Sequence, residues 1–237
     1  MTKRRLIRFA AALLLIAALF AAGYLLTCYR ADQTALAALR SDDAVTVRKT
    51  ETGRLFDGPS DTDLLIFYPG GKVEAAAYAP LLHSLAAAGA DVCLVEMPLR
   101  LAILDPGKAA RVTERAAYEN VWIGGHSLGG AAAAMYAAKH PEGLCGVILL
   151  AAYPTAPLGD SLRVLAVTGD ADGVLNRQRY EDAKRFLPTD AAELVIKGGN
   201  HAQFGNYGAQ KGDGAASVTA EEQQSETIEA ILACMAA

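Results

Sequence analysis

Beyond residue 60, the chain alternates between short runs that are apolar at nearly every position and longer segments with helical character. Six runs show the first pattern: residues 64–69, 91–98, 120–125, 146–152, 163–169 and 193–198. Strands that are apolar on both faces are typical of a parallel sheet with helices on each side. The segments between the runs predict helices over residues 73–89, 107–119, 128–143 and 176–187. The alternation predicts a doubly wound, mostly parallel α/β sheet flanked by helices.

Further elements are expected on either side of this alternating region. Apolar and polar positions alternate over residues 45–56, beyond a short helical stretch at 35–43, which predicts an opening β-hairpin. Near the C-terminus, Thr219 and Glu222 have the spacing of a capping box, and an apolar stripe with helical period follows them. A last helix is therefore expected to begin near Thr219.

Residues 1–30 have a pattern of their own. A basic cluster, "KRRLIR", precedes residues 9–28, which carry no charge. Twenty helical residues reach about 30 Å, the thickness of the hydrocarbon core of a bilayer. Because "LLTCYR" offers no good cleavage site, we expect a transmembrane anchor over residues 1–30, with a cleaved signal and a secreted protein as the alternative. The basic cluster then places the remaining domain, residues 31–237, outside the cytoplasm.

Charge and cysteine content narrow the function classes. Five of the 22 basic residues and none of the 26 acidic ones fall within residues 1–30, which leaves a formal charge of −9 on the rest. Nucleic-acid binding depends on basic side chains that neutralise phosphates, so it is disfavoured. The four cysteines show no metal-ligand spacing. We expect no metal or organic cofactor, and a small molecule as the partner.

The segment "VWIGGHSLGG" holds Ser127 between Gly125 and Gly129. A Gly-x-Ser-x-Gly match gains meaning when a strand precedes it and a helix follows it, as predicted here, because the serine then sits on a sharp nucleophile elbow. A phosphate-binding loop is excluded, since no lysine stands at the required place and the glycines do not read G-x-G-x-x-G. A purely structural turn is the remaining alternative.

A nucleophilic serine needs a histidine base, and the base needs an acid that orients it. In folds with this elbow the chain order is serine, acid, histidine. Of four histidines, only His201 follows a plausible acid. Asp170 and Asp172 both follow the run 163–169, and Asp172 is preferred because it lies deeper in the turn.

Other residues at the same edge of the sheet are candidates for supporting roles. The backbone N–H of Leu128, directly after the nucleophile, is expected to form half of an oxyanion hole, and Gly71 or Lys72 the other half. Glu96 ends a strand at this edge, so Glu96 and Lys72 are candidates for substrate contact; the alternative for Glu96 is a cap on local backbone. The connection at 153–161 is too short for a lid, which predicts an open site.

Together, the motifs "YPGG", "VEMPLRLAIL", "GGHSLGG", "GDADGVL" and "GGNHAQFGNYGAQKGDG" resemble the α/β-hydrolase superfamily, and more narrowly the membrane-anchored bacterial group called alpha/beta hydrolase fold-5. The resemblance implies an α/β-hydrolase fold and places nucleophile, acid and base on Ser127, Asp172 and His201. One departure is "DADG" where the family pattern commonly has S-N-D-G. We expect a serine hydrolase that cleaves an ester or related acyl bond; a non-catalytic binding module of the cell envelope and an acyltransferase are the alternatives.

Overall fold

The computed structural model describes residues 3–113 and 118–237. Within them, eight strands form one sheet in the order β1-β2-β4-β3-β5-β6-β7-β8. The strands are β1 (Thr46–Lys49), β2 (Gly53–Asp57), β3 (Asp63–Tyr68), β4 (Asp91–Val95), β5 (Asn120–His126), β6 (Gly146–Leu150), β7 (Arg163–Gly169) and β8 (Ala192–Ile196). Only the pairings of β1 with β2 and of β2 with β4 are antiparallel. The mostly parallel sheet and the opening hairpin are therefore confirmed.

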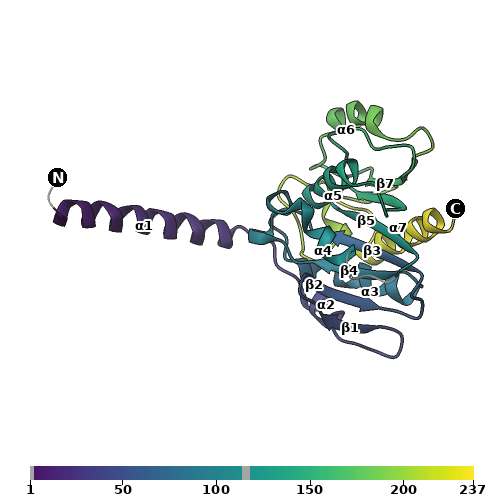
Figure 1. Ribbon diagram of the computed structural model, residues 1–237, viewed down its shortest axis with the longest axis horizontal. Coiled ribbons are helices and arrows are strands. Elements are labelled where there is room, and N and C mark those ends of the chain that lie inside the picture. Colours follow the sequence, from purple (N-terminus) through teal and green to yellow (C-terminus); the bar gives the residue numbers. More distant parts are fainter. Residues whose placement is uncertain (1–2, 114–117) are drawn as a thin grey trace.

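Helices cover both faces of this sheet (Figure 1). The α-helices are α1 (Lys3–Leu26), α2 (Gln33–Ala37), α3 (Ala79–Ala87), α4 (Ala110–Thr113), α5 (Leu128–Lys139), α6 (Arg177–Ala183) and α7 (Ala220–Ala236). The 3-10 helices are η1 (Ala75–Tyr78), η2 (Pro98–Arg100), η3 (Ala102–Leu104), η4 (Pro106–Ala109), η5 (Lys184–Phe186) and η6 (Ala202–Phe204).

Two apolar cores follow from the alternation of side chains along each strand. On β3, Leu65 and Phe67 point into the core formed with α3 and α7, whereas Leu64 and Ile66 point into the core formed with α5 and α6. All four side chains are at most 1% exposed. Because both faces of the central strands are buried, their runs are apolar at every position, as the sequence pattern required.

Several predicted helices have other bounds in the structure, and two of them, residues 73–89 and 107–119, differ most. The segment 73–89 starts with a 3-10 turn, and its α-helix begins at Ala79, because Pro80 has no N–H to donate and fits only the first turn. The segment 107–119 is divided between η4 and the short α4, and residues 114–117 of this prediction lie outside the described residues. The C-terminal helix and its capping box of Thr219 and Glu222 are confirmed.

The N-terminal prediction needs correction. Residues 3–26 do form the helix α1, which projects away from the remainder (Figure 1). In the described part of the chain, however, no helix is both long enough and apolar enough to cross a bilayer, so the predicted transmembrane anchor is wrong. The basic residues that were expected to precede an apolar span lie within the first turns of α1 itself. The predicted location outside the cytoplasm depended on this anchor and stays an untested prediction.

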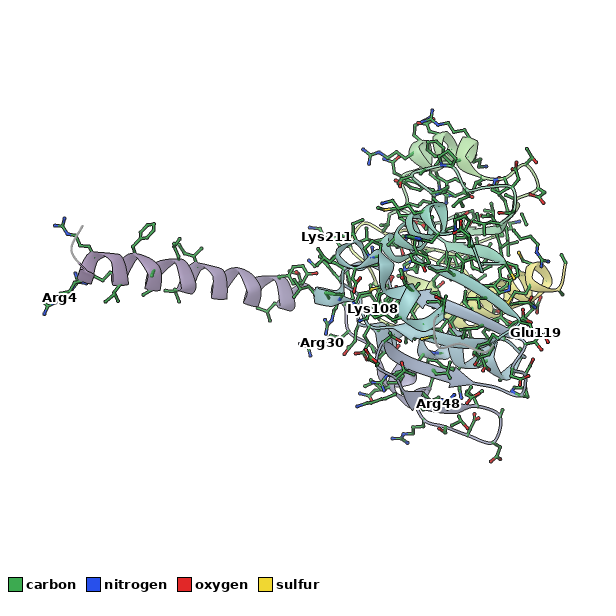
Figure 2. All side chains as sticks on the ribbon, viewed as in Figure 1. Arg4, Arg30, Arg48, Lys108, Glu119 and Lys211 are labelled. Atoms are coloured by element: carbon green, nitrogen blue, oxygen red, sulfur yellow. The ribbon has the colours of Figure 1, made fainter. Side chains whose placement is uncertain are left out.

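The carboxyl ends of the parallel strands face the side on which α1 joins the body. Glu119, which directly precedes β5, lies at the end far from α1, whereas Arg30 and Lys211 lie at the near end (Figure 2). The backbone N–H of Lys211 donates to the Tyr29 hydroxyl at 3.2 Å, which ties a loop of this edge to the chain after α1. Ligands of open α/β sheets bind at this carboxyl edge, and the candidate residues gather there.

Candidate active site

Ser127 occupies a strained turn between β5 and α5. Its φ of 54° and ψ of −122° lie in a region that residues with a side chain rarely adopt. The backbone N–H of Ser127 donates to the Leu150 carbonyl at 2.9 Å, which fixes the turn against β6. A Cβ built on Gly125 or Gly129 would overlap the carbonyl oxygen of Tyr68, so the turn fits against β3 only when both positions are glycine.

We expect Gly129→Ala to destabilise the protein by about 2 kcal/mol or more, because its methyl group would overlap backbone oxygens of Tyr68 and Pro69 that cannot move independently of β3. Gly107→Ala is the matched control, since nothing lies within 4 Å of a Cβ at that exposed position. Urea unfolding measures both. A Gly129→Ala protein as stable as the control would contradict the close packing of the turn.

His201 and Asp172 form a buried pair at the same edge. Nδ1 of His201 lies 2.8 Å from Oδ2 of Asp172, and their side chains are 2% and 0% exposed. The other carboxylate oxygen, Oδ1, accepts the N–H groups of Val174 and Leu175, each at 2.8 Å. A carboxylate held in this way accepts the Nδ1–H of His201 and leaves Nε2 as an acceptor. Nε2 is buried and has no hydrogen-bond partner among the described residues.

The environment keeps Asp172 ionised. Burial alone would raise the pKa of the carboxyl group, but the hydrogen bond and charge of His201 and the two backbone N–H donors outweigh it and lower the pKa below its ordinary value. Asp172 is therefore a carboxylate at neutral pH, as the orienting acid of a histidine base must be.

The alternative acid, Asp170, lies elsewhere in the turn. Its Oδ1 accepts the N–H of Gly198 at 2.6 Å, which closes the loop after β7 onto the loop after β8. Of the two candidates, the structure brings Asp172 to His201.

Asp213 is a supporting residue that the sequence analysis missed. Its carboxylate accepts the N–H of Gly173 at 3.1 Å, of His201 at 3.2 Å and of Ala202 at 2.8 Å. One side chain thus joins the loop that carries Asp172 to the loop that carries His201. Its position within "QKGDG" gave no hint of this role, because all three contacts are made only after folding.

The two expected oxyanion donors are neighbours in space. A Cβ on Gly71 would lie 2.9 Å from Cδ2 and 3.3 Å from Cβ of Leu128. The N–H of Lys72, the alternative donor, is already used, because it donates to the Arg100 carbonyl at 2.8 Å. Among the described residues, no hydrogen bond uses the N–H of Gly71 or of Leu128. Both donors are therefore free for an oxygen ligand at the N-terminus of α5, where the helix dipole favours negative charge.

The His201 ring packs against the residue that directly precedes Ser127. The ring of His126, the residue before Ser127, lies with its centroid 4.5 Å from that of His201. No hydrogen bond between Ser127 Oγ and His201 Nε2 occurs within residues 3–113 and 118–237. Catalytic hydrogen bonds are often long in the absence of substrate, so this gap does not rule out the histidine as base.

Among the described residues, Glu96 forms no hydrogen bond or ion pair with Asp172 or His201. Its side chain is 60% exposed and lies 4.0 Å from the guanidinium of Arg54. With Pro69, Glu74 and Arg100, these residues line a cavity of about 270 Å³ next to the loop after β3.

Lys72 is engaged by the N-terminal segment. Its ammonium donates to the Thr27 hydroxyl at 2.5 Å and lies 5.2 Å from the centre of the Tyr24 ring. The Tyr24 hydroxyl donates in turn to the Leu99 carbonyl at 2.6 Å. The end of α1 therefore packs on the loop that follows β3, and the Lys72 side chain serves that contact here. In the described part of the chain, no three His, Cys, Asp or Glu side chains are grouped as a metal ion would require.

Comparisons with known proteins agree with this architecture. A model of the family described as "Alpha/beta hydrolase family" matches residues 64–225. No curated protein gives a significant match. Among solved structures, the dienelactone hydrolase of Anabaena variabilis has a TM-score of 0.56 and 17% identity, covering 80% of this chain and 98% of that chain.

Other solved structures are similar to a comparable degree. Est1E from Butyrivibrio proteoclasticus has a TM-score of 0.56 and 14% identity, covering 82% of this chain and 100% of that chain. The naproxen esterase of Bacillus subtilis has a TM-score of 0.53 and 14% identity, covering 71% of this chain and 88% of that chain. At these identities the likeness shows the fold alone.

Proposed function

This chain belongs to the alpha/beta hydrolase family, as its motifs predicted, and we propose that it is a serine hydrolase that cleaves a carboxylic ester or a related acyl bond. The observation that carries the proposal is the buried pair of Asp172 and His201, whose unpartnered Nε2 belongs to a ring packed against His126, the residue directly before Ser127. Solved structures with this fold include a dienelactone hydrolase and an esterase, which supports hydrolysis of such bonds.

In the first half of the reaction, Ser127 Oγ attacks the acyl carbon of the substrate while Nε2 of His201 takes the hydroxyl proton. The ionised Asp172 stabilises the imidazolium that forms. The N–H groups of Gly71 and Leu128 donate to the oxygen of the tetrahedral intermediate, and such a donor contributes about 3 to 4 kcal/mol to transition-state stability. His201 then passes its proton to the leaving alcohol, and an acyl-enzyme on Ser127 remains.

In the second half, water replaces the alcohol. Nε2 of His201 takes a proton from the water, the hydroxide adds to the acyl carbon, and the carboxylic acid leaves as Ser127 regains its proton. The same residues carry both halves, so no cofactor enters the scheme.

A panel of p-nitrophenyl esters, lactones and anilides tests the proposal with the full chain. We expect ester hydrolysis with a burst of alcohol release when deacylation is the slower step. Anilides should react more slowly, because an amine leaves less readily than an alcohol. A folded protein that hydrolyses none of these substrates would contradict a hydrolase.

A further inference from the structure

Two buried polar side chains beside the candidate active site have no part in the scheme above. Tyr78 ends η1 and is 0% exposed, and His126 ends β5 and is 1% exposed. The Tyr78 hydroxyl lies 2.8 Å from Nδ1 of His126, and the N–H of Gly70 donates to the same hydroxyl at 3.0 Å. The three groups are packed tightly, because a Cβ on Gly70 would lie 2.6 Å from the Tyr78 hydroxyl and 2.9 Å from Nδ1 of His126.

The chemistry of the groups fixes the direction of one of these two hydrogen bonds. The N–H of Gly70 can only donate, so the oxygen of Tyr78 accepts there. The Tyr78 oxygen has a second lone pair, so its contact with Nδ1 of His126 fits two arrangements: the hydroxyl donates to Nδ1, or an Nδ1–H donates to the hydroxyl oxygen. Neutral His126 carries its proton on Nε2 in the first arrangement and on Nδ1 in the second.

Burial keeps both side chains uncharged. It raises the pKa of the Tyr78 hydroxyl, and it lowers the pKa of His126 well below its usual value, with the neighbouring charge of His201 acting in the same direction. The titratable groups that face the pair are His201, bonded to Asp172, and Tyr207, whose ring centroid lies 6.4 Å from that of Tyr78.

We propose that Tyr78 and His126 are positioning residues that set the oxyanion loop and the His201 ring in register with Ser127. Tyr78 fixes the peptide N–H of Gly70 and thereby the direction of the next one, that of Gly71. His126 directly precedes Ser127 in the chain, so its hydrogen bond to Tyr78 connects Tyr78 to the elbow. The His126 ring packs against that of His201 at 4.5 Å between centroids with an interplanar angle of 54°. The inference rests on the proposed hydrolase function.

The neutral state of His126 also favours protonation of His201. His201 gains a proton when Ser127 attacks, and a second positive ring 4.5 Å away would oppose that step. The buried hydrogen bond between the Tyr78 hydroxyl and Nδ1 of His126 joins two neutral groups, and both stay uncharged while His201 changes its protonation. The carboxylate of Asp172 then stabilises the positive charge that forms on the His201 ring.

The main test is Tyr78→Phe in the full chain. It leaves the Gly70 N–H without its acceptor and frees the loop, so we expect kcat on an ester to fall about 10- to 100-fold while KM stays within about twofold, as misplacement of a transition-state donor requires. The affinity for an alkyl boronic acid, whose adduct with serine resembles the tetrahedral intermediate, should fall by the same factor as kcat/KM.

Tyr207→Phe is the matched control, because it removes a buried hydroxyl that bonds Gln210 at 3.0 Å and reaches neither Gly70 nor His126. Its kcat should stay within about twofold of wild type. A second pair of variants covers the case in which Tyr78→Phe does not fold. His126→Asn keeps a hydrogen-bonding group near the position of Nδ1 but lacks the ring that packs against His201, so it should keep a larger fraction of wild-type kcat than His126→Leu, which should behave like Tyr78→Phe.

The outcomes separate the inference from the function on which it rests. A wild-type protein that forms no adduct with a fluorophosphonate contradicts the hydrolase and the positioning pair together. A reactive wild type with an equally active Tyr78→Phe or His126→Leu protein overturns the positioning pair and leaves the hydrolase intact. A variant whose KM rises while kcat and boronate affinity are unchanged also overturns it, because the hydroxyl would then act on substrate binding.

Discussion

Replacing Ser127 with alanine is expected to lower kcat on an ester by about 10⁵-fold, the largest effect of any single substitution in this chain. Without Oγ no acyl-enzyme forms, and only the binding of substrate and the oxyanion donors remain to accelerate attack by water. The fold should persist, because the Ser127 hydroxyl makes no hydrogen bond within the described residues and alanine removes a single oxygen atom.

Steady-state ester hydrolysis and a thermal unfolding curve check this expectation together. Ser225→Ala provides the matched control, since Ser225 is an exposed residue of α7 far along the chain from the elbow. A stable Ser127→Ala protein that keeps a tenth or more of wild-type kcat would mean that the reaction uses another nucleophile.

The second large effect is expected for Asp172→Asn, which should lower kcat by about 10³- to 10⁴-fold. An asparagine oxygen can still accept the N–H groups of Val174 and Leu175, so the turn should survive. Its amide group, however, presents an N–H to Nδ1 of His201, favours the tautomer with the proton on Nε2, and removes the charge that stabilises the imidazolium.

Asp170→Asn is the control that the chain itself offers. This side chain stands two residues away and accepts the Gly198 N–H at 2.6 Å without reaching His201. Its kcat should stay within about fivefold of wild type. Equal losses in both variants, measured at the same pH, would show that Asp172 has no special relation to the base.

Much of the fold was predictable because its pattern is local. The burial of β3 and β5 on both faces requires continuous apolar runs, and the glycines around Ser127 stand where the elbow touches Tyr68. The pairing of Asp172 with His201 was also accessible, since chain order leaves one suitable histidine.

What escaped prediction depends on contacts between distant segments. Tyr78 reads as an ordinary residue of an alanine-rich segment, and only the folded chain brings its hydroxyl to Gly70 and His126. The Lys72 N–H donates to the Arg100 carbonyl because Leu99 and Arg100 form a turn with positive φ. No sequence pattern predicted this turn. The transmembrane prediction was wrong, since no helix among the described residues is both long enough and apolar enough to cross a membrane.

The central claim is that Ser127 becomes covalently acylated with His201 as its base. The most direct measurement is the intact mass of the full chain after incubation with a fluorophosphonate, followed by peptide mapping of the adduct. We expect one phosphonyl group per chain, located on the peptide that contains Ser127, and none in the Ser127→Ala protein. A folded wild-type protein without an adduct, or with the adduct on another serine, would contradict the claim.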